Sequence, residues 1–178
     1  MSLITFQATL YRPGGKDKGA EWSFLRLPEF VSQALPSRGM VSVEGTLNGA
    51  AFLVTLEPDG EGGHWMKVPP ALRGSSMPGE SVEVALAPAA EEPEPEAPED
   101  LLEALEAAPP KALETWRAIT KAARRDWIFW IVSGKKAETR VKRVGVAISK
   151  LSSGSRRPCC FDRSGMYSKS LSCPVAEE

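Results

Sequence analysis

A run of alternating proline and glutamate near the middle of the chain sets the strongest limit on how this sequence can fold. Residues 88–100 hold six acidic side chains, no lysine or arginine, and no large apolar side chain. Such a segment buries too little apolar surface to offset the entropy of ordering it, and its like charges repel one another. We therefore expect an extended acidic linker with a separate domain on each side.

The regions on the two sides of this linker differ in the sign of their charge. Residues 1–87 carry 7 basic and 9 acidic side chains, whereas residues 101–178 carry 15 basic and 8 acidic ones. The asymmetry predicts an electrostatic role for the C-terminal half, or a contact between that half and the acidic linker.

The sequence predicts a cytoplasmic protein without a membrane span. It has no apolar run of about 18 residues, and residues 1–7 lack the basic and apolar regions of a signal peptide. The three cysteines, an odd number, do not form a disulfide framework.

Residues 1–87 have the pattern of a small β-domain. Apolar and polar residues alternate in several short runs, the first of which contains Ile4, Phe6, Ala8 and Leu10. Asn48-Gly49 predicts a tight hairpin, because both central residues of a type I′ turn need positive φ. Short helices are expected after Pro28 and Pro69. About six strands in so short a chain bury a core best as a small closed or half-closed β-barrel.

Residues 101–154 have helical periodicity and predict a small all-helical domain, so the fold class is α+β with more than one domain. The first helix begins at Pro98 and ends before Pro109, and the third covers 127–132. The second is expected to carry Leu113, Trp116, Ile119 and Ala123. The last should bury one face and end at Gly154, with its apolar positions at Val141, Val144, Ile148 and Leu151. Residues 155–178 form a basic, cysteine-containing tail.

A second row of side chains in the last helix is basic. These candidate contacts for an anionic ligand are Lys136, Arg140, Arg143 and Lys150. They suit an acidic partner or a small anionic ligand. Nucleic-acid binding is an alternative that the sequence does not favour, because aromatic interleaving and a known binding motif are missing.

Two other sets of residues are candidates for chemistry. His64, which follows a glycine-rich loop, and Glu138 form a candidate polar site. A single histidine without a Cys-x-x-Cys motif predicts no metal site, and the loop lacks the Lys-Ser/Thr of a phosphate-binding loop, so no cofactor is expected. Cys159 and Cys160 are candidate reactive thiols, because neighbouring arginines favour thiolate. A thiol-dependent enzyme or redox factor is therefore a second alternative.

Two blocks of residues resemble known families. The first resembles the domain-of-unknown-function family 1905, whose members form a small split β-barrel; its residues are Phe6, Ala8, Leu10, Trp22, Phe24, Pro28, Arg38-Gly39, Gly45, Asn48-Gly49, Phe52 and Gly79-Glu80. The second is similar to the bacteriocin-protection, YdeI/OmpD-associated family; its residues are Pro98, Asp100-Leu101, Trp130-Ile131, Lys135-Lys136, Glu138-Thr139-Arg140, Arg143, Gly154 and Arg156-Arg157-Pro158.

The resemblance implies a role in stress or antimicrobial-peptide tolerance, and it supplies no catalytic residues. Some relatives are described as periplasmic, whereas the sequence gives us no export signal. We therefore predict a binding or stress-protection module without enzymatic activity. Its ligand and oligomeric state are open.

Overall fold

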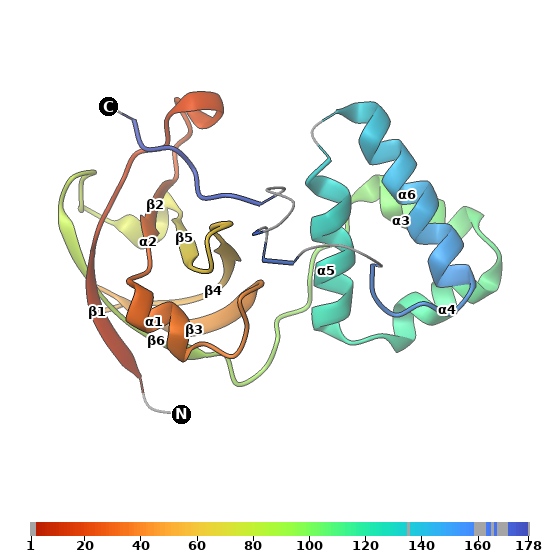
Figure 1. Cartoon of the computed structure of the whole chain (residues 1–178), viewed down its shortest axis with the longest axis horizontal. Helices are drawn as coiled ribbons and strands as arrows, with labels where there is room; N and C mark the ends of the chain where they lie inside the picture. Colours follow the sequence, from red (N-terminus) through yellow and green to blue (C-terminus); the bar gives the residue numbers. More distant parts are fainter. Residues whose placement is uncertain (1–2, 135, 159–162, 165, 167–170, 178) are drawn as a thin grey trace. The chain divides into compact units, whose positions relative to one another are not determined.

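The computed structural model describes residues 3–134, 136–158, 163–164, 166 and 171–177 (Figure 1). These residues belong to two compact units. The β-unit comprises residues 1–91 together with 162–178, and the helical unit comprises residues 92–161. The chain thus leaves the β-unit, forms the helical unit, and then returns to the β-unit.

A six-stranded antiparallel sheet forms the β-unit (Figure 1). In the order of the sheet, its strands are β1 (Ile4–Thr9), β6 (Ser81–Pro88), β3 (Val41–Leu47), β4 (Ala50–Pro58), β5 (His64–Val68) and β2 (Ser23–Arg26). The sheet curls into a half-barrel. The chain just beyond β1 reaches β2 at an isolated bridge, where the Tyr11 and Phe24 amides donate to each other's carbonyls, at 2.8 and 3.0 Å. Curling gives the short strands a shared interior, as their number and length predicted.

The turns of the β-unit follow the local sequence signals. Asn48 and Gly49 have φ values of 47° and 87°, which confirms the tight hairpin between β3 and β4. Helices α1 (Glu29–Ala34) and α2 (Pro70–Arg73) begin directly after Pro28 and Pro69, as expected. A short 3₁₀ helix, η1 (Gly15–Asp17), had not been predicted.

Apolar side chains from alternate strand positions fill the interior of the β-unit. Val31 of α1 is buried with them, so this helix packs against the same core. Burying a large aliphatic side chain contributes roughly 1.5–3 kcal/mol. The fully enclosed members include Leu10, Leu25, Val43, Leu56, Met66, Val84 and Leu86.

Four helices form the described part of the helical unit (Figure 1): α3 (Glu99–Ala107), α4 (Pro110–Ala118), α5 (Lys121–Val132) and α6 (Ala137–Ser152). Their shared core surrounds Trp127 and contains Leu101, Leu105, Ala112, Ile131, Ala147 and Leu151. Gly154 follows α6 with a φ of 87°, the left-handed conformation expected of a residue that ends a helix. Across the described residues, no helix is both long enough and apolar enough to cross a membrane.

Two details of the helical prediction are wrong. The second expected helix is broken, because Ile119 is extended (ψ 162°) and the Thr120 Oγ1 accepts a hydrogen bond from the Ala123 amide at 3.1 Å. That cap starts a new helix, and Ala123 belongs to it. Val141 is 73% exposed, whereas Ala147 is fully buried. The core contacts of α6 come from Val144, Ala147, Ile148 and Leu151, so its buried face begins about one turn later than the apolar spacing predicted.

Candidate functional site

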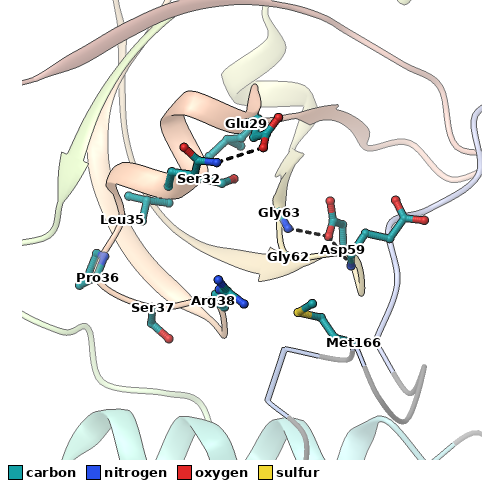
Figure 2. A pocket seen from close by; sticks show the side chains of 13 residues that line it. Glu29, Ser32, Leu35, Pro36, Ser37, Arg38, Asp59, Gly62, Gly63 and Met166 are labelled. Atoms are coloured by element: carbon teal, nitrogen blue, oxygen red, sulfur yellow. Dashed lines mark hydrogen bonds between the residues drawn. The ribbon is translucent and has the colours of Figure 1, made fainter.

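A cavity of about 790 Å³ opens in the β-unit beside α1 (Figure 2). Three segments that are distant in the sequence form its walls: α1 with the loop that follows it, the loop between β4 and β5, and Met166 near the end of the chain. Its polar and charged lining residues are Glu29, Ser32, Gln33, Ser37, Arg38, Asp59 and Glu61. The volume falls within the range of about 300–1,000 Å³ that is usual for small-ligand sites.

Carboxylates predominate among the charged groups of this cavity. Glu29, Asp59 and Glu61 supply three, and Arg38 supplies the single guanidinium among the described lining residues. Figure 2 shows Glu29 on α1 and Asp59 on the loop across the cavity from it. The described lining of the cavity therefore has an excess of negative charge, which favours a ligand with a cationic group.

The acidic loop owes its shape to Asp59. The Asp59 Oδ1 accepts hydrogen bonds from the amides of Glu61 and Gly63, at 2.8 and 2.9 Å (Figure 2). An aspartate that binds backbone amides a few residues further on stabilises a tight turn. Gly62 has a φ of 91°, a conformation that side-chain-bearing residues rarely adopt. Hydrogen bonds between the Asp59 side chain and the loop backbone therefore stabilise the loop, while the Glu61 side chain is exposed.

His64 does not line the cavity, but it is hydrogen-bonded to Ser32 in one of its walls. Its side chain is 1% exposed; Nε2 lies 2.9 Å from the Gly39 carbonyl oxygen, and Nδ1 lies 3.1 Å from the Ser32 Oγ. Because a carbonyl only accepts, Nε2–H donates to Gly39, and Nδ1 of the neutral ring accepts from the Ser32 hydroxyl. Burial lowers the pKa of His64, against the opposing effects of the Gly39 carbonyl and the Asp59 carboxylate. The neutral ring thus joins β5 to α1 and to the loop after α1.

The polar groups behind the lining are engaged in hydrogen bonds within the β-unit. Both nitrogen atoms of His64 already have hydrogen-bond partners, and Ser32 is 6% exposed. The described residues contain no group of three or more histidine, cysteine, aspartate or glutamate side chains that could hold a metal ion.

The structure places the four basic candidates of the last helix in different environments. Arg140 donates from Nε and Nη2 to the two Asp100 carboxylate oxygens, at 2.8 and 3.1 Å, and these hydrogen bonds lower the pKa of Asp100. Arg143 donates to the Trp130 carbonyl at 2.6 Å and lies 5.4 Å from the centre of the Trp130 ring. Lys136 is exposed just before α6, and Lys150 is half-buried in its last turn. Two of the four therefore have partners within the helical unit.

The remaining candidates belong to different units of the chain. Glu138 is exposed in the first turn of α6, whereas His64 is linked to the cavity of the β-unit through Ser32. The candidate reactive thiols Cys159 and Cys160 lie outside the described residues. Cys173 is a free cysteine, and burial raises its pKa while a hydrogen bond from Arg26 opposes that effect.

The acidic linker does contact the basic half, as the charge asymmetry predicted. The Arg125 Nη1 lies 2.6 Å from a Glu92 carboxylate oxygen, and the Arg124 Nη2 lies 3.0 Å from one of Glu94. Arg124 also donates to the carbonyls at the end of α4, those of Trp116 and Ile119. The linker carboxylates thus complete a network that holds α4 and α5 together.

Sequence reasoning identified His64 and its glycine-rich loop but missed the other cavity residues. The turn signal of Asp59-Gly60 and Gly62-Gly63, directly before a buried strand, could have pointed to Asp59 and Glu61. Ser32 has no comparable local signal, because only the folded sheet brings it to His64.

Comparison with known proteins supports the two-unit organisation. A family model described as domain of unknown function DUF1905 matches residues 6–86. A second, described as bacteriocin-protection, YdeI or OmpD-Associated, matches residues 94–154. A search of curated proteins found no match. The two matches follow one another along the chain, DUF1905 first and the bacteriocin-protection, YdeI or OmpD-Associated family second, in the order that the sequence resemblance predicted.

Proposed function

We propose that this protein is a non-enzymatic binding module whose β-unit cavity takes a cationic group of its ligand. The observation that carries this proposal is the composition of the cavity. Three carboxylates and one guanidinium line a hollow of about 790 Å³. Opposite charge across a partly enclosed surface attracts a ligand and orients it.

The ligand class that we infer is a basic peptide. The description of the family matched by the helical unit names bacteriocin protection. On this proposal the chain contributes to protection against an antimicrobial peptide by binding it. The cytoplasmic location expected from the sequence, and the split-barrel type of the curled sheet, belong to the same proposal.

The cavity favours sequestration of a peptide over its cleavage. A general base must reach the proton that it removes. His64 is buried, and both of its ring nitrogens are already hydrogen-bonded, to the Ser32 hydroxyl and the Gly39 carbonyl. This network fixes the walls, which is how a pre-formed binding site avoids the entropic cost of ordering on contact.

Titration calorimetry with two synthetic peptides tests the proposal. One alternates lysine and leucine, and the other has glutamate in place of each lysine. We expect the full chain to bind the lysine peptide, with an affinity that falls as salt is added, and to show no binding of the glutamate peptide. Binding of the glutamate peptide alone would instead favour the basic face of the helical unit and contradict the proposal.

A charge variant assigns the binding to the cavity. Glu61→Gln removes one exposed carboxylate of the lining, and we expect the lysine peptide to bind about two- to fivefold more weakly, the usual effect of one exposed ion pair. Glu44→Gln makes the same change at an exposed position of β3 that does not line the cavity, so its affinity should equal that of the unaltered protein. Equal losses in both variants would show that binding is nonspecific.

A further inference from the structure

The chain returns to the β-unit after the helical unit, and its last described residues lie along the segment between β1 and β2 (Figure 1). We call residues 171–177 the returning segment. The Gly14 amide donates to the Val175 carbonyl, and the Glu177 amide donates to the Arg12 carbonyl, each at 2.7 Å. This antiparallel pairing is the same main-chain contact by which an added peptide extends a sheet.

Side-chain packing shows that the returning segment has a fitted seat. A Cβ atom added to Gly14 would lie 2.9 Å from the Glu177 Cα, closer than real Cβ contacts, so glycine is required there. Leu171 is 5% exposed and Pro174 is buried. The segment therefore buries apolar surface on the β-unit as well as pairing with its backbone.

The same part of the chain borders the cavity. Met166 lines it, and its Sδ lies 3.9 Å from a Cβ built on Gly62 in the acidic loop (Figure 2). In the returning segment, Cys173 accepts a hydrogen bond from Arg26 and experiences the charges of Asp59 and Glu61. Met166 thus contacts the acidic loop, and Cys173 lies near enough to be influenced by the charges of that loop.

We propose that Met166 forms a wall of the ligand cavity and that the returning segment holds this wall in place, so that seating of the segment and binding of a basic peptide strengthen each other. This inference rests on the proposed function and adds a residue that selects the ligand. A thioether packs favourably against aliphatic groups, and lysine and arginine carry long aliphatic stems below their charges. Met166 would contact the stem, while the carboxylates bind the charge. The wall lies outside both matched family ranges, 6–86 and 94–154.

The first test needs no ligand. Gly14→Ala should displace the returning segment, and Glu177→Pro should do so more gently by removing the amide hydrogen that Arg12 accepts. We expect both variants to speed alkylation of Cys173, followed on its own peptide by mass spectrometry, by about tenfold. We also expect faster hydrogen exchange at the amide of Gly63, since the acidic loop loses its neighbour. Gly145→Ala, in open space on α6, is the matched control and should change neither rate.

The second test measures the affinity of the lysine–leucine peptide. Met166→Ala, Gly14→Ala and Glu177→Pro should each weaken binding by about threefold or more, whereas Gly145→Ala should not, because two coupled equilibria affect each other equally. If the unaltered protein binds the peptide and all variants bind it equally well, the wall is refuted while the proposed function stands. If the unaltered protein does not bind the peptide, the proposed function fails. In that case the hydrogen-exchange rate of the Gly63 amide in Gly14→Ala and Glu177→Pro tests the wall without a ligand. If Cys173 alkylation is faster in these variants but the Gly63 exchange rate is unchanged, the wall is refuted.

Discussion

The helical unit and the β-unit use their charged side chains in different ways. In the helical unit, basic side chains pair with acids of the same unit: Arg124 with Glu94, Arg125 with Glu92, Arg140 with Asp100, and Arg157 with Asp126. In the β-unit, three carboxylates surround an open cavity with one arginine. The ion pairs of the helical unit contribute to holding its helices together. The carboxylates of the cavity instead produce a negative electrostatic potential that acts on a ligand entering it.

This difference shows why the sign of the charge of a region does not reveal its role. The C-terminal half is strongly basic in sequence, but Arg140 and Arg143 each have a partner in their own unit. The N-terminal half is nearly neutral, yet it holds the acidic cavity. Local arrangement of charges therefore carries more functional information than their total.

The largest expected effect tests whether the helical unit needs its ion pairs. The Asp126 side chain is buried between Arg125 and Arg157, and Arg125 Nη2 lies 3.5 Å from its Oδ1. Asp126→Ala removes a buried carboxylate that pairs with both arginines, so we expect a loss of about 3 kcal/mol in the free energy of unfolding. Urea denaturation followed by far-ultraviolet circular dichroism measures it.

Glu114→Ala is the control for that measurement, because Glu114 is exposed and its ion pair with Lys111 is long, at 3.9 Å. We expect this change to cost less than about 0.5 kcal/mol. Similar, small losses in both variants would show that the helical unit does not depend on its buried acid, and the contrast between the units would then disappear.

The next effect concerns a carboxyl of the β-unit that does not line the cavity. Burial raises the pKa of Glu57 to about 7, although the Lys67 ammonium acts to lower it. Between about pH 4.5 and pH 7, the Glu57 carboxyl therefore keeps its proton in the folded state but has lost it in the unfolded state, where its pKa has the ordinary value of 4.5. Stability due to this group is therefore present at low pH and falls as pH rises from about 4.5 to 7. We expect Glu57→Gln to be about 2–3 kcal/mol more stable than the unaltered β-unit at about pH 8, and equally stable at about pH 4.5.

Hydrogen exchange of peptides from β3 and β4 at the two pH values measures this change. His64 supplies an internal check with the opposite sign. Its pKa is lowered by burial, so its contribution is complete above the ordinary value of 6.5 and is lost as pH falls below it. With Glu57 replaced, the β-unit should therefore lose stability on acidification below about pH 6.5. A variant whose stability does not change there would contradict the neutral, buried histidine.

The smallest expected effect is at the linker. Glu94 is 60% exposed, whereas its partner Arg124 is 13% exposed and keeps two carbonyl partners without it. We expect Glu94→Gln to cost about 0.5 kcal/mol at low salt and nothing measurable at about 1 M salt. Thermal unfolding at the two salt concentrations measures the difference. A loss that persists in high salt would mean that the linker is held by packing and not by charge.

Strands were easier to predict than helix ends, for a physical reason. Alternation along β1 and the φ requirements of Asn48-Gly49 are local properties of the chain, and the structure confirms both. In the helical half, the apolar spacing continues from Trp116 through Ile119 to Ala123 without interruption. The break depends on Thr120, whose side chain competes with the helix for a backbone amide.

The cavity was beyond sequence reasoning because tertiary structure assembles it. Ser32, Asp59 and Met166 come from segments far apart in the sequence, and of the three only Asp59 lies in a recognisable local motif, the glycine-rich turn. Likewise, the spacing of Arg140 and Arg143 placed them on α6 but gave no sign that Asp100 and the Trp130 carbonyl would bind them. Local patterns define elements, whereas partners of polar side chains depend on how these elements meet.

The return of the chain to the β-unit has a consequence during synthesis. All six strands emerge from the ribosome before the helical unit, but residues 171–177 emerge after it. At roughly 5–20 residues per second, the strands wait on the order of 4–16 seconds for the residues that complete their surface. During that interval Gly14 and its neighbours are an unoccupied edge, open to any extended peptide in the cell, and seating of residues 171–177 closes it.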